Sequence, residues 1–141
     1  MRVRAALRAR QPALTGLHVL VAEDDAEMRR VIVDTLVRDG AEISEAASGV
    51  ALFDWLRRMA HDGELPDLLI SDVRMPGLSG LQVLRMVRDR GWSVPVILIT
   101  AFGDEDTHNE ASDLGATAVF DKPFDVDDLR TAVVHFVRDP R

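Results

Sequence analysis

The sequence predicts one doubly wound α/β domain, in which helices cover both faces of a five-stranded parallel sheet. Its length of 141 residues is typical of a single domain. From residue 17 onward, five short apolar runs of strand length alternate with segments of helical spacing. This alternation is typical of parallel strands joined by helical crossovers, because strands buried on both faces are nearly continuous in apolar residues.

The predicted strands are residues 17–22, 41–46, 67–71, 94–100 and 117–121. Right-handed crossovers between them give a flavodoxin-like sheet with the strand order 2-1-3-4-5. In such a sheet, ligands bind at the carboxyl ends of the strands, near the point where the strand order reverses. The residues that follow the strands are therefore the first candidates for function.

Between the strands, apolar residues recur at the spacing of helices that bury one face. The clearest stripe is Leu52, Phe53, Leu56, Met59 and Ala60. Two similar stripes precede glycines, where helices commonly end; they are Met28, Val31, Ile32 and Leu36 before Gly40, and Val83, Leu84 and Val87 before Gly91. A last helix begins near Asp125, a suitable N-cap, and contains Val126, Leu129, Val133, Phe136 and Val137. The weakest stripe, residues 103–114, contains Ala111 and Leu114, so we expect this helix to be the least firmly packed.

The composition excludes several classes of protein. With 47% hydrophobic and 29% charged residues, the chain is typical of an ordinary globular domain, and it has no cysteine for a disulfide or a thiolate metal site. A chain without cysteine fits the reducing cytoplasm. No apolar run approaches the roughly 20 residues that a membrane span needs, and no signal segment opens the chain. We therefore expect a cytoplasmic protein with no membrane partner.

The net charge of −7 is unevenly distributed. Residues 1–16 contain no acid and four arginines, Arg2, Arg4, Arg8 and Arg10, so the rest of the chain is more acidic than the whole. We expect residues 1–16 to be a disordered tail, residues 17–138 to fold, and residues 139–141 to be a short C-terminal tail. Nucleic-acid binding depends on Lys and Arg that neutralise phosphates, so the acidic body argues against nucleic acid as a direct partner.

Charged and hydroxyl side chains lie at or just after the ends of four predicted strands; they are Glu23, Asp24 and Asp25, then Asp72, then Thr100, and last Lys122 with Pro123. Carboxylates that lie close together raise one another's pKa unless a cation lies between them. Mg²⁺ suits an open site of this kind, because it binds a few carboxylates and keeps several waters. Asp25 has an alternative role as the cap of the next helix. Lys122 is the only lysine among 17 Lys and Arg residues, which favours a site that needs a compact ammonium.

Four segments, LHVLVAEDD, LLISDVRMPGLSG, VILITA and VFDKPF, resemble in order and spacing the receiver domains of two-component response regulators. The resemblance covers residues 17–138 and implies the receiver fold. It implies that Asp72 is the phosphoacceptor and that Thr100 and Lys122 contact the phosphoryl oxygens. It further implies that Mg²⁺ is held by Glu23, Asp24, Asp72 and the main-chain carbonyl of Arg74.

The resemblance has further implications for the surroundings of this site. The Lys122–Pro123 bond is expected to be cis. Small Ala101 leaves the site open to a phosphodonor, and Gly80 permits the following helix to approach closely. No nucleotide-binding motif is present, so the phosphoryl group must arrive on a partner, which in this family is a histidine kinase or a histidine phosphotransfer protein. The chain is then a phosphoacceptor that takes part only in its own phosphotransfer and autodephosphorylation, and it signals as a monomer or weak dimer to an unknown protein target.

The chain departs from the receiver pattern at two positions. Glu23 stands where Asp is commoner, which lengthens one arm of the metal site. Val119 stands where receivers usually carry Tyr or Phe, and Phe120 cannot replace that ring because successive strand residues face opposite sides. We therefore expect the response to phosphorylation to depend on Thr100 and the helix of residues 103–114. The four histidines, His108 among them, lie outside the strand-end motifs and are interpreted as surface or packing residues.

Three alternatives remain open. The chain is interpreted as a single-domain receiver, but a receiver cut from a longer regulator or hybrid kinase has the same sequence pattern. Phosphatases similar to haloacid dehalogenases also combine an Asp nucleophile with Mg²⁺, Thr and Lys, but their nucleophile follows the first strand in a DxD motif, where this chain has EDD. A flavodoxin-like cofactor binder needs residues that hold a phosphate after the first strand, where this chain has acids.

Overall fold

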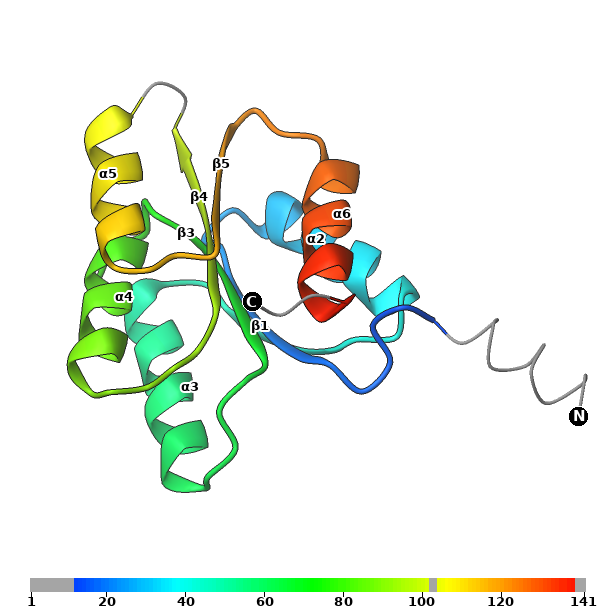
Figure 1. Cartoon of the computed structure of the whole chain (residues 1–141), viewed down its shortest axis with the longest axis horizontal. Coiled ribbons are helices and arrows are strands. Elements are labelled where there is room, and N and C mark those ends of the chain that lie inside the picture. Colours follow the sequence, from blue (N-terminus) through cyan, green and yellow to red (C-terminus); the bar gives the residue numbers. More distant parts are fainter. Residues whose placement is uncertain (1–11, 102–103, 139–141) are drawn as a thin grey trace, which may run out of the picture.

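The computed structural model describes residues 12–101 and 104–138, which form one parallel sheet covered by helices on both faces (Figure 1). The strands are β1 (His18–Ala22), β2 (Glu42–Ala46), β3 (Leu68–Asp72), β4 (Val96–Ala101) and β5 (Ala118–Lys122). They pair in the order β2-β1-β3-β4-β5, and every pair is parallel. The predicted fold class and strand order are confirmed.

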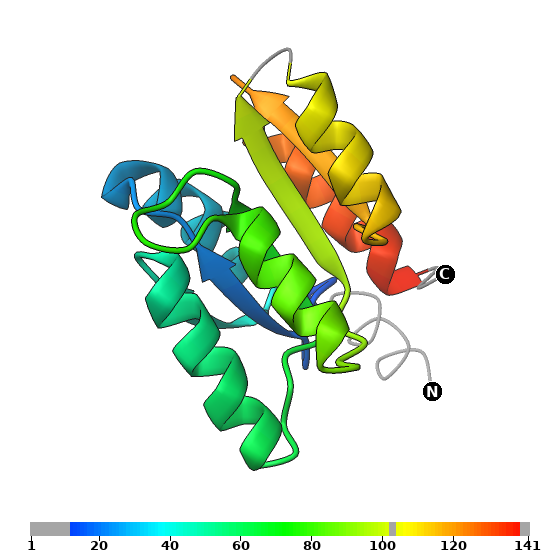
Figure 2. The same ribbon diagram turned by 90° about the vertical axis from the view of Figure 1, so that its left-hand side faces the viewer.

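The helices are α2 (Ala26–Arg38), α3 (Gly49–His61), α4 (Gly80–Asp89), α5 (Glu105–Asp113) and α6 (Val126–Arg138). Helices α2 and α6 cover one face of the sheet, and α3, α4 and α5 cover the other (Figures 1 and 2). Within the described residues, no helix has the length and apolar character to cross a bilayer.

The sheet separates two hydrophobic cores. Because side chains alternate along a strand, Leu98 of β4 packs with α3, α4 and α5, while its neighbours Ile97 and Ile99 pack with α2 and α6. An ion pair joins the two helices of the α2 and α6 layer. The Arg130 guanidinium of α6 donates to both carboxylate oxygens of Asp39 at the end of α2, at 2.5 and 3.1 Å. Each face is therefore a packed layer of its own.

The helix stripes are largely confirmed, with corrections at their margins. Ile32 and Leu36 of α2 are buried, but Val31 is 47% exposed. Val137, predicted to lie on the buried face of α6, is also exposed. Consecutive helix residues are about 100° apart, so a residue beside a narrow buried stripe turns toward solvent. Helix α5 is the least apolar, since its buried residues are the small Thr107 and Ala111.

The segment before β1 belongs to the core, which corrects the predicted boundary between tail and domain. Leu14 is fully buried against the α2 and α6 layer, and its amide donates to the carbonyl of Asp39 at 2.7 Å. Gly40 has φ +95°, and a β-carbon there would lie 2.7 Å from Thr15 Oγ1, so the segment packs closely on the end of α2. A single leucine in a short segment between Pro12 and Gly16 has no periodicity, so only the folded chain identifies it as a core residue. The rest of the predicted N-terminal tail, residues 1–11, and the predicted C-terminal tail, residues 139–141, lie outside the described residues.

Replacing Leu14 tests whether this segment contributes to the fold. Leu14→Ala should lower the free energy of unfolding by about 2–4 kcal/mol, because it leaves a cavity in a closed core. Val31→Ala removes a largely exposed side chain and should change the free energy of unfolding by about 0.5 kcal/mol or less. Urea unfolding followed by circular dichroism compares the two variants, and equal small effects would show that Leu14 lies outside the cooperative unit.

Candidate functional site

The carboxyl ends of four strands bring the predicted site residues to one edge of the sheet. Glu23 follows β1, Asp72 ends β3, Thr100 is the penultimate residue of β4 and Lys122 ends β5. Because the strands are parallel and adjacent, these ends face the same direction (Figure 2). The sheet therefore brings together in space side chains that lie up to about a hundred residues apart in the sequence, from Glu23 to Lys122.

Three carboxylates gather at this edge. Glu23, Asp24 and Asp72 each offer an oxygen, and these oxygens lie within 4.8 Å of one another. Glu23 and Asp72 are only 1% and 3% exposed, whereas Asp24 is exposed at the mouth of the site. Two inner carboxylates and one outer carboxylate form an open set of oxygen donors. This donor set fits Mg²⁺, which takes a few carboxylates and retains water.

Lys122 lies between the two buried acids. Its Nζ is 2.7 Å from Asp72 Oδ2 and 3.3 Å from Glu23 Oε1. Burial by itself would lower the pKa of the Lys122 ammonium, but the hydrogen bond and charge of Asp72, and then those of Glu23, outweigh burial and raise it. Lys122 therefore stays charged and forms ion pairs with both carboxylates.

One ammonium does not balance the carboxylates around it. The pKa of Glu23 is raised from 4.5 to about 7, chiefly by burial, and further by hydrogen bonding and charge repulsion from Asp72 and by Asp24. Lys122 acts in the opposite direction but does not overcome these effects. The site thus carries more negative charge than its own residues neutralise, and a divalent cation would offset the excess.

The loop after β3 is held closely against the site. The amide of Arg74 donates to Asp72 Oδ1 at 3.3 Å, and the amide of Gly80 donates to the carbonyl of Val73 at 2.8 Å. A β-carbon at Gly80 would lie 2.4 Å from the carbonyl oxygen of Asp72, so only glycine permits α4 to begin here. A shallow hollow of about 440 Å³ opens beside Asp24, lined by Val73, Arg74, Met75, Pro76 and Ser79.

Asp25 turns away from the acidic site. Its carboxylate accepts hydrogen bonds from the amides of Glu27 and Met28 and so caps α2. The alternative role as a helix cap is therefore the one observed. Glu23 and Asp24 are left as the pair that faces Asp72.

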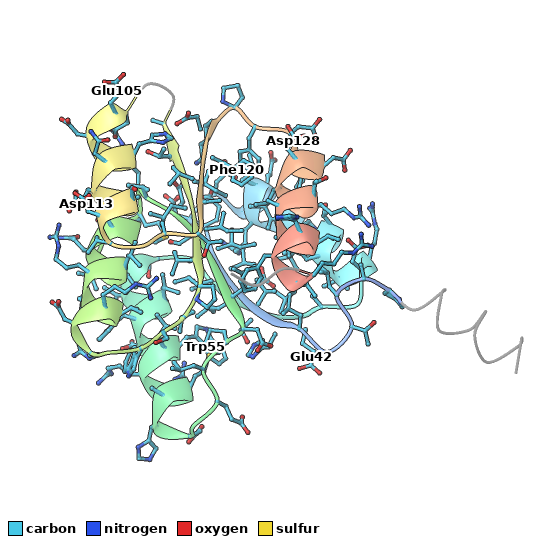
Figure 3. The ribbon with its side chains drawn as sticks, in the orientation of Figure 1. Glu42, Trp55, Glu105, Asp113, Phe120 and Asp128 are labelled. Carbon is cyan, nitrogen blue, oxygen red and sulfur yellow. The ribbon has the colours of Figure 1, made fainter. Side chains whose placement is uncertain are left out.

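The switch positions lie as the alternation of strand residues predicts. Thr100 is buried, and it shares a sheet face with Val119, which packs in the layer of α3, α4 and α5. Phe120 points to the opposite face, where it packs near Phe124 and α6 (Figure 3). Ala101 is exposed, and the Lys122–Pro123 bond is cis, as expected.

Two polar contacts near the site were not predicted. The His108 ring of α5 lies 2.6 Å from the carboxylate of Asp121, the residue before Lys122. Arg29 of α2 donates to the main-chain carbonyl of Glu23 at 2.7 Å and to the Glu45 carboxylate of β2 at 3.1 Å. Each contact depends on how a helix packs against the sheet, so no local sequence pattern indicates it. The sequence offers one weak indication of the His108 contact, which is that Asp121 is an acid within a predicted strand.

Comparison with known proteins agrees with this site. Residues 19–134 match the response regulator receiver domain family. The chain is 30% identical over 119 residues to sporulation initiation phosphotransferase F of Bacillus subtilis, which covers 84% of this chain and 92% of that protein. It is 33% identical over 122 residues to the DNA-binding transcriptional regulator NtrC of Escherichia coli, which covers 84% of this chain but 25% of NtrC. A solved response regulator receiver domain protein from Clostridium thermocellum superposes with a TM-score of 0.75 and 29% identity, over 88% of this chain and 96% of that chain.

The family match extends from β1 into α6 and so includes every strand end that forms the acidic site. The sheet order, the cluster of three carboxylates and the lysine between them occur together in that matched region. The chain therefore belongs to the response regulator receiver domains of two-component systems.

Proposed function

We propose that Asp72 accepts a phosphoryl group from the phosphohistidine of a histidine kinase or histidine phosphotransfer protein. The observation that carries this proposal is the 2.7 Å contact between the buried Asp72 carboxylate and Lys122, beside two further acids. Glu23, Asp24, Asp72 and the main-chain carbonyl of Arg74 would hold Mg²⁺. When bound, Mg²⁺ neutralises charge on the transferring phosphoryl oxygens.

The residues of the site divide the chemistry among them. A carboxylate oxygen of Asp72 attacks phosphorus in line, the P–N bond breaks, and its electron pair returns to the imidazole nitrogen of the donor. Lys122 already lies against Asp72 and can follow the new acyl phosphate with its ammonium. Thr100 offers a hydroxyl from the neighbouring strand. Exposed Ala101 leaves space for the donor to enter.

The alternatives are weighed by the same geometry. A phosphatase similar to haloacid dehalogenases needs its nucleophile after β1, but there Glu23 and Asp24 face Asp72 on β3, and Lys122 contacts Asp72 more closely than Glu23. Near-complete coverage of the Bacillus phosphotransferase supports a single-domain receiver. Such a receiver would act in the cytoplasm as a monomer or weak dimer that contacts other proteins. The chain spans about a quarter of NtrC, which keeps a receiver within a longer regulator as the second candidate.

Asp72→Asn provides the direct test of the phosphoacceptor. Wild-type protein incubated with acetyl phosphate and Mg²⁺ should gain the mass of one phosphoryl group, and Asp72→Asn should gain none, because an amide is a far weaker nucleophile than a carboxylate. Intact-mass spectrometry measures both, with a chelator as the metal control. Equal labelling of wild type and Asp72→Asn would reject the assignment.

The raised pKa of Glu23 predicts how stability depends on pH when no metal is present. Between about pH 5 and pH 7 the folded state keeps a proton on Glu23 that the unfolded state has lost, so the free energy of unfolding should fall as pH rises through this range. The fall should be on the order of 2 kcal/mol. Urea unfolding in chelator measures it, and Glu23→Gln should lack this part of the pH dependence. The same pH dependence in both proteins would contradict the electrostatic description of the site.

We propose further that α5 carries the response to phosphorylation. Thr100 is paired in register with Asp121, and Asp121 contacts His108 of α5, so the helix is attached to the strand at the level of Thr100. Val119, on the same sheet face, is too small to fill space that a moving threonine vacates. Helix α5 buries only small side chains and can shift at low cost.

Hydrogen exchange with and without beryllofluoride, a phosphoryl mimic, tests this route. Changes in protection should concentrate in residues 100–114 and should vanish in Thr100→Ala, because that variant removes the hydroxyl that the phosphoryl group attracts. Changes centred on residues 117–121 that persist in Thr100→Ala would show that β5 carries the response.

A further inference from the structure

We propose that Arg29 is a positioning residue for the metal site, which it serves by fixing the main chain of Glu23. This inference rests on the proposed function, since it concerns how one of its carboxylate ligands is held. Arg29 does not reach the carboxylate cluster itself; it acts from α2 on the backbone that carries Glu23.

The contacts of Arg29 join three elements around the end of β1. Its Nη1 donates to the carbonyl oxygen of Glu23 at 2.7 Å, while its Nε donates to Glu45 Oε1 of β2 at 3.1 Å. The side chain is only 20% exposed. A planar guanidinium can make both bonds in a fixed relative geometry, whereas a lysine ammonium cannot reproduce that fork.

Glu23 needs such support because it stands just beyond the last residue of β1. Its amide still donates to the carbonyl of Ala46 at 3.0 Å, so β2 holds one side of the residue and Arg29 holds the other. The Glu23 side chain has more rotatable bonds than an aspartate, and it faces repulsion from Asp72. A fixed backbone therefore limits how far the carboxylate can turn away from its neighbours.

The charge of Arg29 alone does not explain its place. Glu45 offsets part of that charge through its ion pair with Arg29, and the group that Arg29 contacts at Glu23 is the neutral main-chain carbonyl. Arg30, the next residue of α2, is 83% exposed, and its one ion partner among the described residues is Asp34, 4.0 Å away. The two arginines thus carry the same charge on the same helix, and only one of them holds Glu23.

Binding of Mg²⁺ to the full chain, measured by titration calorimetry, tests the proposal. Arg29→Gln should weaken Mg²⁺ binding about tenfold, the lower range for loss of a residue that orients a metal ligand. Arg30→Gln should change the affinity by less than about twofold. Arg130→Gln breaks the ion pair with Asp39 in another part of the fold, so it should lower the free energy of unfolding while leaving Mg²⁺ affinity unchanged.

The comparison of affinity with stability separates positioning from a general loss of structure. If Arg29→Gln lowers only the free energy of unfolding, as Arg130→Gln does, the proposal is wrong. If Arg29→Gln does not fold, Arg29→Lys and Arg30→Lys are compared instead, because both variants keep the positive charge. Only Arg29→Lys should weaken Mg²⁺ binding. Equal Mg²⁺ affinities of the two variants would overturn the proposal. If the proposed function itself is wrong, a different result is expected: the wild-type protein should bind Mg²⁺ no more tightly than Glu23→Gln.

Discussion

Two buried carboxylates that share one ammonium are the constraint around which this domain is organised. Glu23 and Asp72 lie almost without solvent, and Lys122 contacts both. Such a cluster is costly to bury unless its charges are paired, and here the pairing is incomplete. An incomplete pairing lowers stability, but it suits the proposed function, in which the site binds a cation and a phosphoryl group.

Backbone interactions fix the positions from which these side chains extend. Strand register fixes the ends of β1, β3, β4 and β5 relative to one another. Gly80 allows α4 to start against the carbonyl of Asp72, and Asp25 closes the first turn of α2. Glu23 and Lys122 therefore start from fixed backbone positions when they meet at Asp72, which favours one geometry over many.

Much of this could be predicted from the sequence because the signals are local. Apolar runs and helical stripes determine the order of elements, and the rule for parallel sheets places Glu23, Asp72, Thr100 and Lys122 at one edge. Contacts between distant elements give no such signal. From the sequence, Leu14 belongs to an Arg-rich tail and Val31 to a buried stripe. In the structure, Leu14 packs against the end of α2, and Val31 lies beside the stripe and is exposed. The contacts of Arg29 and His108 likewise depend on how helices dock on the sheet.

The separation of the core into two layers has a consequence for recognition. Arg130 and Asp39 join α6 to the end of α2 on one side of the sheet. On the other side α5 buries only the small Thr107 and Ala111, and its polar contacts run to its own layer and to β5, through Glu110 with Arg85 and His108 with Asp121. A displacement of α5 can therefore be absorbed within its own layer, since the sheet stands between it and α2 and α6. Under the proposed function, a partner that binds α2 and α6 would contact the same surface in the unphosphorylated and the phosphorylated protein. A partner that binds α5 would distinguish these two states. A kinase and a downstream target could thus bind opposite faces of the same sheet.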